Sequence, residues 1–421
     1  MSARRLLPWP LVALFTAGYL ASYLLPTTVG RLDTGLPLTA TQAGAIGSAL
    51  LLSSAAAGFL LASRVDRFGP RTLARLGLAL TFLGYGAAAL TGVVPAVVAG
   101  AVVGGFGSGT VTVVAASGIA ALGAPPARAE SRAWGRDPHR ATTLGLLAVS
   151  ALAGALYLTI PHLGPGHGLP LAALALTALA VWPFTPRLSA RTAPARTAAA
   201  HGRLPQRRAG LLLAAAMPCW SLAQNALWGV SGRIGLAQAH LTEVTVGAVF
   251  AVALGAGLLG VLGAGALGLR LGRAVPIGAG TALIAACIAV TASATDLPAF
   301  AAGEISWNLF YPVVLSYVIG LAASLDRRGR WAVFVGSAAS LGGAAGPLTG
   351  SVLAGSAGFP LMGQVLAAAL LVVAAPMTAV ALRAGRRILP VVEVPLESPA
   401  MPARPAYDTA SPNSYASTSA M

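Results

Sequence analysis

Residues 63–71 read SRVDRFGPR and form a short basic stretch between two long apolar runs. A related stretch, GLRLGR, separates two apolar runs in the second half of the chain. Arg67 and Gly69 of the first stretch correspond to Arg270 and Gly272 of the second, 203 residues further along. This offset indicates an internal repeat, in which the two halves of the chain share one layout.

The composition indicates that most of this chain lies in lipid. Of its 421 residues, 56% are hydrophobic and only 9% are charged, and the mean hydropathy is +0.78. Soluble proteins carry about 25% charged residues, and one soluble core could not bury so much apolar surface. The net charge of +16 comes from 27 arginines, since lysine is absent. They stand in short clusters between apolar runs, which is typical of membrane orientation and not of nucleic-acid binding.

A helix that crosses the hydrocarbon needs about 20 mostly apolar residues. Twelve runs meet this requirement, at 7–29, 39–62, 73–93, 95–122, 141–161, 169–186, 209–231, 243–268, 274–294, 298–323, 331–355 and 360–382. We therefore predict an all-α integral membrane fold with twelve transmembrane helices, in two six-helix bundles related by pseudo-symmetry.

The arginines predict the orientation of these helices. With the N-terminus in the cytoplasm, 25 of the 27 arginines fall in cytoplasmic segments, and only Arg31 and Arg233 lie near the outer face. Because cytoplasmic loops are enriched in basic residues, we expect both termini in the cytoplasm and the chain in the inner (cytoplasmic) membrane.

The polar segments between the runs predict the domain boundaries. Residues 1–186 are expected to form the first bundle, and residues 209–387 the second. The basic, Pro- and Ala-rich segment 187–208 is expected to be a cytoplasmic linker. Residues 388–421 are rich in Pro, Ser, Thr and Ala, which predicts a disordered cytoplasmic tail.

The stretch at 63–71 resembles the signature loop of the major facilitator superfamily, G-x-x-x-D-R-x-G-R-R. Asp66, Arg67, Gly69 and Arg71 match it, whereas the sequence has Ala for the first Gly and Pro for one Arg. The second-half copy has Leu269 at the position of the Asp. The layout of six plus six helices extends the resemblance along nearly the whole membrane portion. It implies the fold of that superfamily and alternating access, but no particular substrate.

The resemblance also implies a gating role for Asp66, Arg67, Gly69 and Arg71. The eleventh run begins near Trp331 on the cytoplasmic side, and the start of a helix carries partial positive charge. By the resemblance, Asp66 lies against that helix end and holds the halves together when the protein is open outward. A plain solvated turn that orients the chain is the alternative.

Polar side chains inside the apolar runs predict a substrate cavity, since each of them costs free energy in lipid. The resemblance implies that the first, fourth, seventh and tenth helices line that cavity. Three of them carry aromatic, amide and hydroxyl residues, many on one helical face: Tyr19, Tyr23, Ser221, Gln224, Asn225, Trp228, Trp307, Asn308 and Tyr311. The alternative is hydrogen bonding between packed helices, worth about 0.6 kcal/mol each. The mostly neutral, aromatic set favours a small organic molecule with an apolar body and a few hydrogen-bonding groups.

Glu304 is the candidate for proton coupling. It is the one acidic residue in the interior of a run, about 10 Å from the outer end of the tenth helix at 1.5 Å per residue. Desolvation at that depth favours the protonated carboxyl, so Glu304 could load and release a proton as the cavity alternates. Arg233, at the outer end of the seventh helix, is the ion-pair candidate that could instead hold Glu304 charged.

Together these features predict a secondary active transporter that moves a small organic solute, with a proton as the expected coupling ion. Efflux of a drug-like compound or metabolite is slightly favoured over the alternative, a proton-coupled uptake permease or uniporter; a non-transporting receptor is more remote. The sequence has no GxxxxGK[ST] loop for ATP, and its five histidines form no HExxH spacing, so we expect no enzyme activity, metal or cofactor. The expected partners are substrate, proton and membrane lipid, with no nucleic acid, and the protein is expected to be a monomer.

Overall fold

The computed structural model describes residues 9–122, 138–188, 204–268, 270–326 and 329–386. Nearly all of these residues are helical, as the long apolar runs predict. The first half contains α1 (Trp9–Tyr23), α2 (Leu25–Gly35), α3 (Ala40–Leu61), α4 (Val65–Phe68), α5 (Pro70–Leu90), α6 (Val94–Leu122), α7 (Pro138–Thr159), η1 (Ile160–Leu163), α8 (Gly168–Val181) and η2 (Trp182–Arg187). The second half contains α9 (Arg207–Arg233), η3 (Ile234–Gln238), α10 (Glu243–Leu267), α11 (Ala274–Ala292), α12 (Leu297–Leu325) and α13 (Arg330–Arg386).

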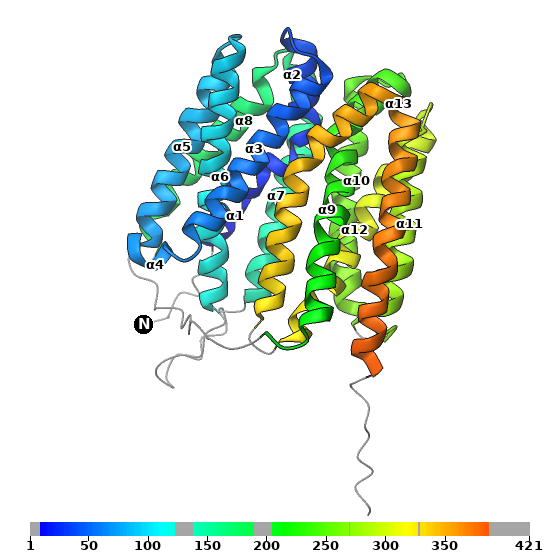
Figure 1. Cartoon of the computed structure of the whole chain (residues 1–421). Coiled ribbons are helices and arrows are strands. Elements are labelled where there is room, and N and C mark those ends of the chain that lie inside the picture. The colour runs from blue at the N-terminus through cyan, green and yellow to red at the C-terminus, as the bar shows by residue number, and fades with distance from the viewer. Residues whose placement is uncertain (1–8, 123–137, 189–203, 269, 327–328, 387–421) are drawn as a thin grey trace, which may run out of the picture.

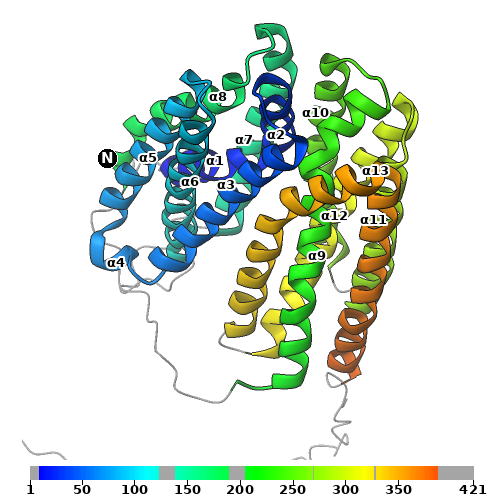
Figure 2. The same ribbon diagram turned by 45° about the horizontal axis from the view of Figure 1, so that its top comes forward.

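The helices form two groups that lie side by side, α1–α8 in blue to cyan and α9–α13 in green to orange (Figure 1). Contacts between the groups are made where α2 packs on α9, α3 on α13 and α7 on α10. We call the end that carries α4 the α4 face, and the end reached by α2 the α2 face (Figures 1 and 2). The fold is therefore the all-α membrane architecture that the sequence predicts.

Ten helices among the described residues are long and apolar enough to cross a membrane, or eleven if α1 and α2 form one bent span. The long helix α13 is interrupted at Gly358, whose φ of 79° and ψ of 163° are not helical. The runs expected at 331–355 and 360–382 lie on either side of this residue. Apolar side chains that remain exposed, such as Leu83, Leu90 and Val372, suit a lipid environment. The count of twelve spans remains a prediction.

The run expected at 7–29 is divided between α1 and α2, and α2 continues to Gly35. It breaks between Tyr23 and Leu25 with a bend of 48°. Pro26 has no backbone N–H, so it cannot donate to the Ser22 carbonyl one turn earlier. Side chains from other helices bond the carbonyls at the break instead: Trp228 Nε1 donates to Ser22 O at 3.0 Å, and Tyr157 Oη donates to Tyr23 O at 2.5 Å.

The two halves repeat one backbone feature at the position that the sequence comparison singled out. Gly69 has a φ of 81° and Gly272 a φ of 66°. Side chains larger than hydrogen are strained at such angles, which explains why both copies of the stretch keep glycine.

Small residues let several helices approach closely. A Cβ atom at Gly84 of α5 would overlap the backbone of Gly104 in α6, so these two helices touch at this point. A Cβ at Gly342 or Gly350 would overlap the backbone of α9. Glycine at these positions therefore lets the helix backbones touch, as small residues commonly do between membrane helices.

Candidate functional site

A cavity of about 1040 Å³ lies between the two groups of helices. Toward the α4 face its wall includes Phe59 near the end of α3, His139 at the start of α7, and Ala332 and Val333 at the start of α13. Toward the α2 face it ends at Ser22 of α1 and Trp228 of α9. The cavity thus reaches the α4 face and is closed at the α2 face.

The structure brings all nine predicted cavity residues to this one wall. They come from α1, α9 and α12: Tyr19, Tyr23, Ser221, Gln224, Asn225, Trp228, Trp307, Asn308 and Tyr311. The sequence interpretation missed Trp220, which also lines the cavity. A signal for it was present, because Trp220, Gln224 and Trp228 are spaced four residues apart and share a helical face.

Four aromatic rings from the second half form a continuous row along the wall. Trp220 stacks on Tyr311 with ring centroids 5.4 Å apart, Tyr311 lies 5.6 Å from Trp307, and Trp307 lies 5.5 Å from Trp228. Phe15 and Tyr19 of α1 form a further ring pair at 4.4 Å. Aromatic rings at these separations attract one another beyond their burial, so the row is a fixed surface.

The amide side chains are held by their own helices. Asn225 Nδ2 donates to Ser221 O at 2.9 Å, and Asn308 Nδ2 donates to Glu304 O at 3.1 Å. Gln224 Oε1 accepts from Trp307 Nε1 and thereby joins α9 to α12. Of the lining residues that the structure describes, none is Asp, Glu, Lys or Arg.

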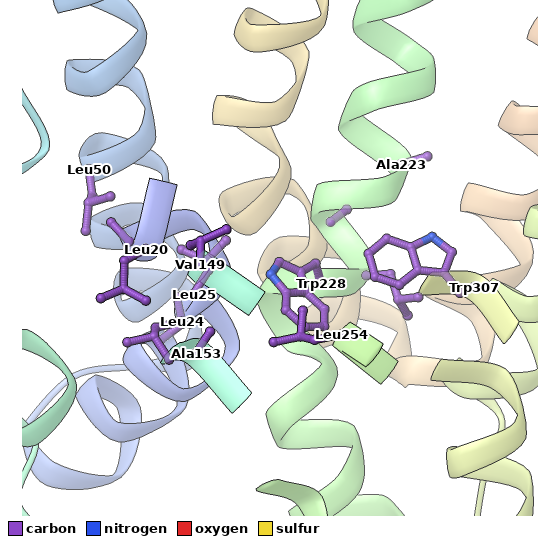
Figure 3. Packing of buried hydrophobic residues seen from close by; sticks show 14 of the residues in the cluster. Leu20, Leu24, Leu25, Leu50, Val149, Ala153, Ala223, Trp228, Leu254 and Trp307 are labelled. Carbon is purple, nitrogen blue, oxygen red and sulfur yellow. The ribbon is translucent and has the colours of Figure 1, made fainter. Parts of the chain in front are cut away.

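Trp228 closes the cavity where the two halves meet. Its ring stacks on Trp307 and meets the edge of Phe250 at 5.3 Å. Its Nε1 crosses to the first half and donates to Ser22 O. Figure 3 shows Trp228 between Val149 of the first half and Trp307 of the second. The side chain therefore forms part of both the cavity wall and the contact between the halves.

Glu304 lies behind this wall and is absent from the lining. Its side chain is fully buried. Oε1 accepts from Ser231 Oγ at 2.5 Å, and Oε2 has no partner among the described residues. The Ser231 hydroxyl also lies 3.0 Å from Leu227 O. One hydroxyl proton cannot serve both acceptors, whereas a protonated Glu304 that donates to Ser231 leaves the hydroxyl free to donate to Leu227.

Arg31 lies at the closed end of the protein and contacts both halves. It is only 4% exposed, although it lies at the α2 face. Its Nε donates to Glu243 Oε1 of the second half at 2.7 Å. Its other nitrogens donate to carbonyl oxygens of the first half, those of Gly164 at 2.5 Å, Gly166 at 3.1 Å and Ile160 at 3.2 Å. One guanidinium therefore satisfies the end of η1 and binds the opposite half.

Arg233 makes the reverse connection. It belongs to the second half, and its Nη1 lies 4.0 Å from Asp33 Oδ2 of the first half. Its Nη2 donates to Ser351 Oγ of α13 at 2.8 Å. The ion pairs of Arg31 and Arg233 therefore cross between the halves in opposite directions. The two arginines stand 202 residues apart, which is nearly the offset of the repeat.

The suggested pairing of Arg233 with Glu304 is not formed in this conformation. Arg233 reaches Asp33 and Ser351, whereas Glu304 bonds Ser231. Arg233 follows Ser231 by two residues, so the two side chains leave α9 in different directions. The sequence identified both charges but not their partners.

The predicted gate residues lie around α4. Gly69 takes the left-handed turn described above, and Arg71 Nη2 donates to the carbonyls of Pro186 at 2.6 Å and Leu188 at 2.9 Å. Arg67 is exposed, with its guanidinium 6.0 Å from the Phe68 ring. The expectation about the Asp66 side chain, like that about Leu269, falls outside the described residues.

No protein-family model matches this sequence, and no curated protein sequence matches it. Solved structures do match the fold. The human organic anion transporter MFSD10 (TETRAN) is 18% identical with a TM-score of 0.62, over 90% of this chain and 100% of that one. The inward-open xylose transporter XylE from E. coli is 14% identical with a TM-score of 0.63, over 87% and 94%. A D-xylose–proton symporter is 16% identical with a TM-score of 0.65, over 87% and 95%.

These similarities span nearly the whole length of each protein, and all three are transporters. The chain therefore has the fold of the major facilitator superfamily transporters, as the loop at 63–71 predicts.

Proposed function

We propose that this protein is a secondary active transporter that moves a small organic solute by alternating access. The α4 face carries the basic segments that predict the cytoplasm, so we assign this structure to an inward-facing state. The observation that carries the proposal is the cavity between the two halves, reaching one face and sealed at the other by side chains that cross from half to half. Such a seal can open only if the halves move apart.

The cavity wall supports a substrate with an apolar, planar body. Its rings offer stacking surfaces, and its amides and hydroxyls offer a few hydrogen-bonding groups. A sugar phosphate or another multivalent anion would meet no arginine among the described lining residues. Pockets of this kind bind small organic molecules.

Proton coupling at Glu304 is part of the proposal. A fully buried carboxyl with no cationic partner among the described residues is costly when ionised, and its contacts with Ser231 suit the protonated form. Movement of the halves would separate Trp228 from Ser22 and bring water to Glu304. Proton-coupled efflux is slightly favoured, and proton-coupled uptake or uniport is the alternative.

Cysteine cross-linking at the α2 face tests alternating access. A Cβ at Gly355 of the second half lies 3.7 Å from Thr41 Oγ1 of the first half, which places a Thr41→Cys, Gly355→Cys pair within disulfide reach. The native cysteines, Cys219 and Cys287, are first replaced by alanine. Purified protein in liposomes is then assayed for flux of a panel of cationic, neutral and anionic aromatic compounds under imposed pH gradients.

We expect oxidation to stop flux and dithiothreitol to restore it, whereas each single-cysteine variant is unaffected by the oxidant. Full cross-linking with unchanged flux would refute alternating access. A protein that binds members of the panel but moves none of them is a receptor, which would refute transport.

A further inference from the structure

We infer that the cavity binds an aromatic molecule that carries one protonated amine, that is, an organic monocation. This inference rests on the proposed function, because it names the class of solute for the same cavity. Three features of the cavity lead to it: the direction of the amide groups, the aromatic row, and the lack of Lys and Arg among the described lining residues.

The amides present acceptors to the cavity. Asn225 and Asn308 each donate an Nδ2 hydrogen to the carbonyl one turn earlier in their own helix. Reversing either amide would set two oxygen acceptors against each other, so the chemistry fixes the orientation. Each Oδ1 then points away from its helix backbone, where a substrate N–H group can donate to it.

The N–H donors of Gln224 and of the three tryptophans are less accessible than these acceptors. Gln224 Nε2 and Trp220 Nε1 have no partner among the described residues, but both nitrogen atoms are buried. Trp228 Nε1 and Trp307 Nε1 already donate, to Ser22 O and Gln224 Oε1. The hydroxyls of Tyr19, Tyr23, Tyr311 and Ser221 also line the cavity, and each can donate or accept. The preference for an ammonium group therefore comes from the amide oxygens, which only accept.

The aromatic row also favours a positive charge. The face of an aromatic ring is electrostatically negative and attracts a nearby ammonium. Trp220, Tyr311, Trp307 and Trp228 form this row within one wall. Tyr311 is half-buried, whereas Trp220, Trp307 and Trp228 are 0%, 5% and 7% exposed. The Tyr311 ring, backed by the tryptophans, is therefore the face on which the planar part of an aromatic substrate would stack.

The surrounding charges point the same way. Both guanidiniums that lie deep between the halves face carboxylates, Arg31 with Glu243 and Arg233 with Asp33. An anionic substrate would therefore find neither Lys nor Arg among the described residues that line the cavity.

Binding of three matched naphthalenes tests the inference. The probes are 1-naphthylmethylamine, which is cationic at pH 7, the neutral 1-naphthalenemethanol and the anionic 1-naphthoate. Equilibrium dialysis against the purified full chain in lipid nanodiscs gives their affinities. We expect the amine to bind about tenfold more tightly than the alcohol, the scale of a desolvated cation–π contact plus one hydrogen bond, and the carboxylate to bind most weakly.

Variants assign the preference to the wall. Asn308→Leu, which keeps the size but removes the acceptor, should reduce the preference for the amine over the alcohol to about threefold or less. Ser356→Ala is the control, because Ser356 is exposed outside the cavity lining and its hydroxyl is bonded to Leu353 O; it should keep the preference. Monodisperse elution of each variant shows that it folds.

Equal affinity for amine and alcohol, tighter binding of the carboxylate, or binding of none of the three would each overturn the inference. An unchanged preference in Asn308→Leu would also overturn it, since the acceptors of the wall would then play no part. These outcomes leave alternating access untouched, because the Thr41–Gly355 cross-link tests that separately and with neutral and anionic compounds as well.

Discussion

Arg31 of α2 donates to Glu243 of α10 at 2.7 Å and so ties the first half of the protein to the second at the α2 face. Arg31 is buried, and its remaining bonds go to carbonyls of its own half. Loss of Glu243 therefore removes the attraction between the halves without leaving the guanidinium unpartnered. This asymmetry makes Glu243 a specific probe of the seal.

We expect Glu243→Gln to fold normally and to spend more time open at the α2 face. Gln keeps an acceptor for Arg31 Nε but loses the negative charge. The partly exposed ion pair of Arg31 with Glu243 is worth about 1 kcal/mol or less. A change of about 1 kcal/mol alters the ratio of open to closed protein about fivefold. Reaction of a Ser22→Cys probe with a membrane-impermeant thiol reagent that is added only on the side of the α2 face, in the cysteine-free background, measures the opening. An unchanged reaction rate would show that this pair does not hold the halves together.

Arg31→Ala should behave differently and destabilise the fold. It leaves the carbonyls of Gly164, Gly166 and Ile160 without their donor, in addition to the lost ion pair. Leaving a buried acceptor without its donor costs about 1–3 kcal/mol. Thermal unfolding should show a lower Tm than wild type and than Glu243→Gln; equal Tm values for the two variants would contradict this role of Arg31.

Trp228→Phe tests the contact between Trp228 and the broken first helix. Phenylalanine keeps an aromatic ring against Trp307 but cannot donate to Ser22 O. A hydrogen bond of this kind between membrane helices is worth about 0.6 kcal/mol, so we expect a two- to threefold faster reaction of the same Ser22→Cys probe. Trp228→Ala, which also removes the ring, should open the α2 face further and weaken binding of the naphthylmethylamine probe.

Glu304→Gln should abolish proton-driven accumulation. It should leave substrate binding and counterflow exchange of substrate intact. The glutamine can still bond Ser231, so the packing of α9 on α12 is preserved, but it cannot exchange a proton. The measurement is uptake or efflux in liposomes with and without a pH gradient. Accumulation that still follows the pH gradient in this variant would remove Glu304 from the coupling mechanism.

Asp66→Asn should leave the protein folded and inserted but strongly reduce transport. The fixed charge expected at the start of the eleventh helix is lost, and with it the contact that closes the cytoplasmic side. Leu269→Asn at the equivalent position of the second half is the control and should transport normally. Wild-type flux in Asp66→Asn would show that the loop has only an orienting role.

The orientation can be measured independently. Reporter fusions should place both termini, the segment 187–208 and the loop at 123–140 in the cytoplasm, because 25 of 27 arginines fall on that side. An external position for the segment 187–208 would contradict the predicted helix count or orientation, and with it the assignment of the α4 face to the cytoplasm.

The sequence by itself determined that most of this protein lies in lipid, that it is helical, and that its two halves share one layout. Membrane helices satisfy their backbone groups within themselves, so a long apolar run predicts a helix without knowledge of its neighbours. Once a run is known to be helical, the spacing of its polar residues defines a face, and in this way the polar faces of α9 and α12 could be recognised. The structure brings Gln224, Asn225, Asn308 and Tyr311 of these faces to one wall.

Only the tertiary structure decided which groups from distant parts of the chain meet. Arg31 and Glu243 are separated by 212 residues, and the partner of Arg233 is Asp33, not Glu304. The break in the first helix depends on Pro26, but the donor that bonds the freed Ser22 carbonyl comes from Trp228 in the other half. Spacing along one helix defines a face, whereas pairing across the bundle depends on how the helices cross and tilt, and that geometry arises from the packing of all of them together.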